Sequence, residues 1–149
     1  MIMLMTAAVV LIVGGVLFTN QKEFDTIIVT FPNGKQIATE VANTPEKQLF
    51  GLAFREGLPP DSGMLYIFDT SDRHRLGTKA YRIPVDMIWV DESHRVVHLI
   101  EDAQPCPQDP CPLYGPPQEA ARYIIQTAAG FVRRERVVPG AELKFALRL

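Results

Sequence analysis

The sequence predicts a mainly β protein, a compact antiparallel β sandwich or jelly-roll-like barrel with one or two short helices, preceded by an N-terminal hydrophobic helix. Three observations predict this fold class. Seven or so short segments rich in β-branched and aromatic residues follow one another along the chain, tight turns separate two pairs of them, and helical patterns are few and short. A chain of 149 residues that is 47% hydrophobic and 21% charged is sufficient for one folded domain.

The N-terminus predicts a membrane anchor. The stretch Ile2–Phe18 contains no charged residue, and its length is near the lower limit of about 17–25 residues for a membrane-spanning helix. It exceeds the apolar part of a signal peptide, which is about 7–15 residues, and no A-x-A cleavage site follows it. We therefore expect residues 1–19 to be an uncleaved, signal-like anchor, residues 20–25 a polar linker, and residues 26–149 a single β domain. The alternative interpretation is a buried core helix.

The domain is predicted to begin with a β-hairpin and a short helix. Thr26–Phe31 is rich in β-branched residues, and Gln36–Ala42 returns after a turn with Asn-Gly at its tip. A helix is expected next, because Thr44 can accept a hydrogen bond at its N-terminus and Pro45 suits the first helical position. Gly51 should end this helix.

A central strand is predicted at Ile83–Asp91. Both of its faces are apolar apart from Asp86, which is typical of a strand that is covered on both sides. Gly63–Phe68 is predicted to form the strand before it. Residues 96–101 return from the central strand as a second hairpin.

Two more strands complete the predicted domain. They are Ala121–Thr127 and residues 142–149, with a small helix or turn over residues 129–140. The last strand alternates between apolar and polar residues, so one of its faces should point into the core. The residues predicted to face inwards are Leu143, Phe145, Leu147 and Leu149.

The chain's two cysteines, Cys106 and Cys111, lie in the proline-rich stretch Ala103–Pro117. A structural zinc site needs four ligands, and no histidine follows at a suitable spacing. A thioredoxin-like pair has two intervening residues at the start of a helix, whereas here four residues intervene and the prolines exclude a regular helix. The pair is therefore predicted to form a structural disulfide in an oxidising compartment, and no metal or cofactor is expected.

Five blocks of the chain agree in order and spacing with one known family. They are EVANTPEKQLFGLAFREGLP, GMLYIFD, IPVDMIWVDE with RVVHL, PCPQDPCPLY, and ARYIIQTAAG with the later PG. Together they resemble the family called domain of unknown function 192 (DUF192), which is widespread in bacteria and archaea. The resemblance implies a compact β sandwich of jelly-roll type that is often exported, and it implies no established activity.

The sequence departs from this family just before the central strand. The family usually carries an aromatic-Met-Lys-Asn run there, and here only Lys79 matches, with Gly77, Thr78 and Ala80 at the other positions. The hairpin tip ESHR also lacks the glycine that the family usually has. His94 is therefore expected to adopt a backbone conformation that is unusual for a non-glycine residue.

Asp86 is the main candidate for a functional residue. A carboxylate on an apolar central strand must be paired or hydrogen-bonded. Its possible partners are Lys79 and Arg82 by chain position, and Arg55 by the family pattern. One interpretation is a buried structural ion pair or a strand-end hydrogen bond. The other is a pocket in which Arg55 and Lys79 bind an anionic or hydroxyl-rich ligand and Asp86 orients them.

Composition excludes some functions and leaves others open. Fifteen basic and seventeen acidic residues give a net charge of −2, so no nucleic-acid partner is expected. No catalytic constellation is recognisable. The predicted function is a ligand-binding or accessory module of the cell envelope, anchored in the membrane, facing the periplasm or the cell exterior, and binding a saccharide or a peptide. The alternatives are a hydrolase or transferase that uses Asp86 with Lys79 or Arg55, and a purely structural envelope protein.

Overall fold

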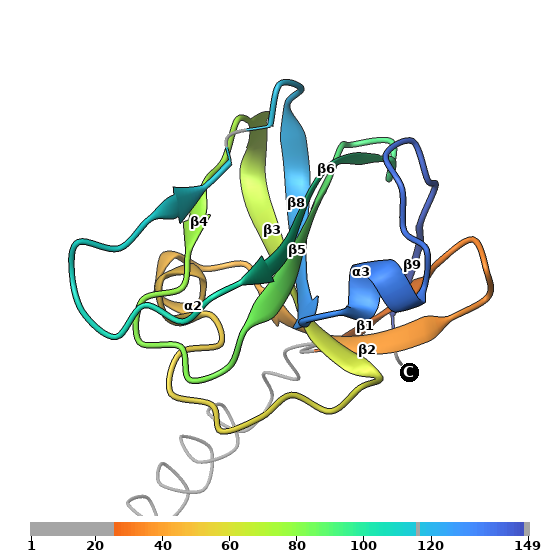
Figure 1. The fold of residues 1–149 in the computed structure, drawn as a ribbon. Helices are drawn as coiled ribbons and strands as arrows, with labels where there is room; N and C mark the ends of the chain where they lie inside the picture. The colour runs from red at the N-terminus through yellow and green to blue at the C-terminus, as the bar shows by residue number, and fades with distance from the viewer. Residues whose placement is uncertain (1–25, 116, 148–149) are drawn as a thin grey trace, which may run out of the picture.

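The structure, a computed structural model, describes residues 26–115 and 117–147 (Figure 1). The predicted anchor and linker, residues 1–25, lie outside the described residues, so the structure does not test them. Within the described part of the chain, no helix is long and apolar enough to cross a membrane.

Strands are the main regular structure of the described chain, with two small helices between them (Figure 1). The strands are β1 (Thr26–Thr30), β2 (Gln36–Ala42), β3 (Ser62–Asp72), β4 (Leu76–Gly77), β5 (Val85–Val90), β6 (Val96–Ala103), β7 (Leu113–Tyr114), β8 (Ala121–Ala128) and β9 (Lys144–Leu147). The helices are α2 (Pro45–Phe50) and α3 (Phe131–Arg134). The mainly β class predicted from the sequence is confirmed.

The strands form one large curled sheet and one small one. The large sheet has seven strands in the order β6-β5-β8-β3-β2-β1-β9, and β4 pairs with β7 separately. Every pair in the large sheet is antiparallel except β2 and β3, which run parallel. The sheet curls until Arg95, before β6, forms an isolated bridge with Glu142, before β9. Within the described residues, β6 and β9 themselves do not pair, so the sheet is not a closed barrel.

The predicted antiparallel sandwich or barrel is therefore wrong in its architecture, because the sheet is mixed and open. The cause is the connection from β2 to β3. It runs through α2 and the loop up to Asp61, and it brings the chain back to the end at which β2 began. A connection of this length and helical content permits a parallel pair, whereas a tight turn would require an antiparallel one.

The core lies on both sides of the sheet, and β5 contributes to both sides. Val85, Met87 and Trp89 pack in one apolar cluster, whereas Ile88 and Val90 pack in the other, together with residues of α3. All six residues of β5 are buried, and β5 lies between β6 and β8. The predicted central strand with two covered faces is confirmed.

The predicted local elements are confirmed except at the C-terminal strand. The hairpins β1–β2 and β5–β6 form, and α2 begins at Pro45 with the Thr44 hydroxyl accepting the Lys47 N–H at 3.2 Å. Leu149 lies outside the described residues, and Leu143 is buried. Leu147 is 57% exposed, so the prediction that it packs into the core is wrong. It lies on the edge strand β9 beside the start of β1, beyond the core.

Candidate functional site

Asp86 is completely buried, and backbone groups satisfy its carboxylate. Its Oδ1 accepts a hydrogen bond from the Asp102 N–H at 2.8 Å, and its Oδ2 accepts one from the Val132 N–H at 2.9 Å. Val132 is in the first turn of α3, whose N-cap residue, Gly130, offers no side chain. Asp86 therefore caps α3 from β5. Such N–H donors compensate a carboxylate for its loss of water.

The two cations close to Asp86 in sequence pair with other residues. Lys79 Nζ lies 2.6 Å from Asp109 Oδ2, and Arg82 pairs with Glu56. Both pairs are exposed. Neither cation forms an ion pair with Asp86 in the described chain. The structural interpretation of Asp86 allowed either a buried ion pair or a strand-end hydrogen bond. The contacts of Asp86 match the hydrogen bond and not the ion pair.

Arg55 lies in the turn after α2 and binds Glu40 of β2. Its Nη1 and Nη2 donate to the two carboxylate oxygens of Glu40, each at 2.6 Å, which is the bidentate geometry that a guanidinium favours. The hydrogen bonds from Arg55 hold the pKa of the Glu40 carboxyl below its usual value, although partial burial opposes this. The same hydrogen bonds raise the pKa of the Arg55 guanidinium. The pair stays ionised at neutral pH.

A pocket of about 530 Å³ opens beside this pair, between β2, β3 and α2. Its wall combines the charged pair with the aromatic ring of Phe50, which is 59% exposed. The other lining residues are Thr26, Val41, Glu46, Lys47, Gly51 and Met64. Of the three residues predicted to bind a ligand, only Arg55 lines this pocket. Lys79 and Asp86 lie elsewhere, so the structure does not bring the predicted trio together here.

Two buried tyrosines, Tyr66 and Tyr81, lie next to Gly51 in the wall of the pocket. Tyr66 and Tyr81 donate to Gln126 Oε1 at 2.9 and 2.8 Å, and the Leu52 N–H donates to the Tyr81 hydroxyl at 3.2 Å. A Cβ at Gly51 would clash with both tyrosine hydroxyls, so only glycine fits this part of the wall. Burial raises the pKa of Tyr66 well above its ordinary value.

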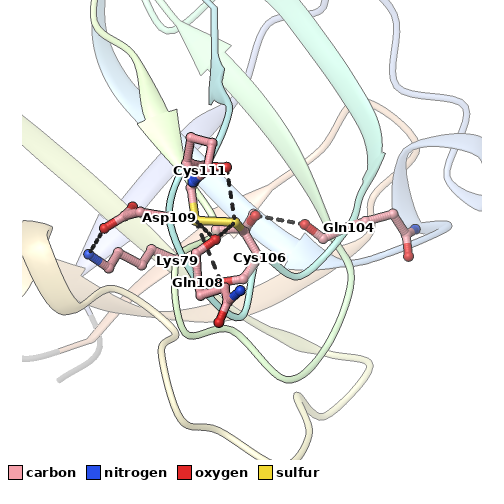
Figure 2. Close-up of a disulfide and its surroundings, with 8 residues drawn as sticks. Lys79, Gln104, Cys106, Gln108, Asp109 and Cys111 are labelled. Atoms are coloured by element: carbon pink, nitrogen blue, oxygen red, sulfur yellow. Dashed lines mark hydrogen bonds and ion pairs between the residues drawn. A yellow bond between two sulfur atoms is a disulfide. The ribbon is translucent and has the colours of Figure 1, made fainter.

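Cys106 and Cys111 form a disulfide, as predicted (Figure 2). The loop it closes is attached to the segment before β5. The Cys106 N–H donates to the Thr78 carbonyl at 3.1 Å, and the Ala80 N–H donates to the Cys106 carbonyl at 3.0 Å. Figure 2 shows Lys79 reaching from that segment to Asp109 inside the loop. The disulfide loop therefore fixes the position of Lys79.

Two residues that replace the family's usual ones have a left-handed backbone. His94 has φ of 62°, as predicted for the hairpin tip, and Ala80 has φ of 60°. Asparagine tolerates this conformation better than alanine does. The family's usual asparagine at the position of Ala80 therefore has a backbone explanation, which does not require a role in a binding site.

Sequence reasoning missed Glu40, Phe50 and Met64 as pocket residues. Glu40 is opposite Met64 in the parallel β2–β3 pair, and the predicted antiparallel arrangement did not include this pairing. The signal that was available is local. The block from EVAN to FREG contains a carboxylate, an aromatic residue and an arginine around one short helix.

The fold and this pocket define a small mixed-sheet β domain with a polar and aromatic pocket beside α2. The DUF192 family profile, described as "Uncharacterized ACR", matches residues 28–145. The protein therefore belongs to the DUF192 family. No curated protein matches the chain.

Two solved structures resemble the domain. One is a Sinorhizobium meliloti 1021 protein described as a candidate transcription regulator, with a TM-score of 0.71 and 24% identity over 80% of this chain and 92% of that one. The other is a Novosphingobium aromaticivorans DSM 12444 protein of unknown function, with a TM-score of 0.69 and 23% identity over 80% of this chain and 83% of that one. At these identities the similarity establishes the fold alone.

Proposed function

We propose that the protein is a membrane-tethered binding module of the cell envelope, and that its pocket beside Arg55 and Glu40 binds a saccharide. The observation that carries the proposal is the combination of an exposed aromatic ring, Phe50, with a bidentate arginine–carboxylate pair in one pocket of about 530 Å³. Ligand pockets of this general size combine apolar walls with a few polar groups that fix orientation.

The chemistry of a sugar matches this wall. A pyranose has an apolar C–H face, which packs on an aromatic ring, and a rim of hydroxyls that both donate and accept hydrogen bonds. Arg55 offers only donors and Glu40 only acceptors, so together they can bind neighbouring hydroxyls of one sugar. Because the two charges neutralise each other, the pair suits a neutral, hydroxyl-rich ligand better than a charged one.

The proposed location rests on two features of the chain. The apolar stretch Ile2–Phe18 has the composition of an anchor, and the disulfide between Cys106 and Cys111 is of a kind that persists in oxidising compartments. Both support a domain that faces the periplasm or the cell exterior.

The hydrolase or transferase alternative has less support. It requires Asp86 to reach a substrate together with Lys79 or Arg55. However, Asp86 is 0% exposed, and both of its oxygens accept backbone hydrogen bonds. A purely structural envelope protein would bind no ligand at all, so a binding experiment separates it from the proposal.

The test is a binding screen of the full chain in detergent micelles against a panel of envelope glycans and a panel of peptides. We expect at least one glycan to bind, and Arg55→Ala to weaken its binding about tenfold or more, since hydrogen bonds to charged groups contribute about 1.5–3 kcal/mol. Arg95→Ala is the matched control, because Arg95 also pairs with a surface glutamate, Glu142, but lies outside the pocket. Binding of peptides alone, or equal binding by Arg55→Ala and the wild type, would overturn the saccharide proposal.

A further inference from the structure

The end of α2 and the turn after it expose an unusual amount of apolar surface. Leu49 is 81% exposed, Phe50 59% and Phe54 60%. These are three of the six large hydrophobic side chains that are exposed in the described chain, and they lie within six consecutive residues. No residue of α2 is buried, so this helix contributes none of its side chains to the core.

This exposure has no explanation within the domain. Burial of one large apolar side chain contributes about 1.5–3 kcal/mol relative to exposure, and α2 forgoes that contribution at both Leu49 and Phe50. Single exposed hydrophobic residues are common on protein surfaces, whereas clusters of them mark surfaces that contact a partner or a membrane.

The position of the chain's N-terminal part indicates the partner. Thr26, the first described residue, lines the same pocket as Phe50, so the described domain begins beside Phe50. The seven residues between Phe18 and Thr26 can span at most about 25 Å when extended. A bilayer that holds Ile2–Phe18 is therefore within reach of Leu49, Phe50 and Phe54.

The charges around these residues suit a lipid surface without net charge. Three glutamates and three cations lie on α2, on the turn after it or in ion pairs with that turn, so their charges cancel. They are Glu40, Glu46, Glu56, Lys47, Arg55 and Arg82. An exposed apolar cluster without excess positive charge has no electrostatic preference for anionic lipid.

We propose that Leu49, Phe50 and Phe54 form a docking face that rests on the interface of a zwitterionic bilayer. The proposal builds on the tether of the proposed function, since Ile2–Phe18 brings the face to the membrane. Aromatic and leucine side chains are those that amphipathic surface segments insert at this depth. The pocket, which shares Phe50 with this face, then lies at the membrane surface and meets ligands that the membrane presents.

The experiment places a fluorescent probe on the face without altering the charged pair. The full chain is reconstituted in phosphatidylcholine vesicles with and without brominated acyl chains, which quench tryptophan on contact. Leu49→Trp adds a probe at a residue outside the pocket lining. The native Trp89 is 0% exposed and provides the background. Val138→Trp is the matched control, because Val138 is also exposed, at 57%, and lines a different pocket.

We expect brominated lipid to quench the added fluorescence of Leu49→Trp and to leave that of Val138→Trp unchanged, equally at low and high salt because no net charge is involved. If the wild-type chain sediments with vesicles but Leu49→Trp is not quenched more than Val138→Trp, the docking face is overturned and the tether stands. If the chain does not sediment with vesicles, both are overturned. Glycan binding in detergent micelles tests the pocket independently of either result.

Discussion

Glu40, which pairs with Arg55, and Asp86 are carboxylates on two strands of the same sheet, and they differ in their exposure to solvent. Asp86 is buried, and the N–H groups of Asp102 and Val132 occupy its two oxygens. The Arg55–Glu40 pair is half-exposed at the rim of a pocket. The difference teaches that a buried carboxylate can have a structural role. When backbone N–H groups from other segments donate to it, it connects those segments to its own strand. A self-neutralised pair at a pocket rim still has lone pairs and N–H groups for a ligand.

The largest predicted effect on stability is at Asp86. Asp86→Ala should lower the free energy of unfolding by about 3 kcal/mol, because the buried N–H of Val132 and the part-buried N–H of Asp102 lose their acceptor, at about 1–3 kcal/mol for each group that is left unpaired. Denaturant unfolding followed by Trp89 fluorescence measures this. Asp109→Ala is the control, since it removes an exposed carboxylate from the Lys79 pair and should cost less than about 1 kcal/mol. Equal stability of the two variants would contradict the structural role of Asp86.

The next largest predicted effect on stability is at Gly51, in the wall of the pocket. Gly51→Ala should destabilise the protein by about 2–3 kcal/mol, from a side chain in the left-handed region and from the clash with two tyrosine hydroxyls. Gly34→Ala is the matched control, because Gly34 also has positive φ but has open space around it, so it should cost only about 1 kcal/mol. A Tyr66→Phe background should recover part of the Gly51→Ala loss. Equal costs at Gly51 and Gly34 would show that the tyrosines do not shape the wall.

Tyr66 should make the stability of the domain sensitive to alkaline pH. Its pKa in the folded state is raised well above the ordinary value. The phenol therefore stays protonated in the folded state at a pH, about 10, at which the unfolded state releases the proton. Stability from this group is complete below that pH and is lost as the pH rises above it. Unfolding measured from pH 8 upwards should therefore show a shallower decline in Tyr66→Phe than in the wild type. Identical slopes would contradict burial of the phenol.

The smallest expected effect concerns the segment that carries Lys79. Ala80→Gly should raise the free energy of unfolding by about 0.5–1 kcal/mol, because φ of 60° costs alanine more than glycine. His94→Gly relieves a similar backbone conformation, but it loses the stacking of His94 on Phe145, whose ring centroids are 4.2 Å apart. Its net gain should be smaller. Thermal unfolding compares the two, and a larger gain at His94 would refute this explanation.

Much of the fold could be predicted because its signals are local. The double-sided apolar pattern of β5, the Thr44–Pro45 helix start and the closely spaced Cys106–Cys111 pair each lie within a few residues. The parallel pairing of β2 with β3 could not be predicted, since it depends on the path of the chain through α2. The exposure of Leu147 likewise depends on β9 being an edge strand, which alternation alone does not reveal.

The candidate site was harder to predict than the fold. Chain position predicts Lys79 and Arg82 as partners of Asp86, and the family pattern predicts Arg55, but each of these cations pairs with another carboxylate. Asp86 is satisfied by backbone N–H groups, and such groups have no signature in a sequence because every residue except proline has one. Glu40 and Arg55 are 15 residues apart in the sequence, and the fold brings their side chains together.

Mapping the bound saccharide on the protein tests the central claim most directly. The isotope-labelled full chain in detergent micelles is titrated with the best-binding glycan while backbone and side-chain NMR shifts are recorded. The account predicts the largest shift changes at Glu40, Phe50 and the Arg55 guanidinium, and none at Asp86. Changes centred on Asp86, or on Lys79 and the disulfide loop, would contradict it.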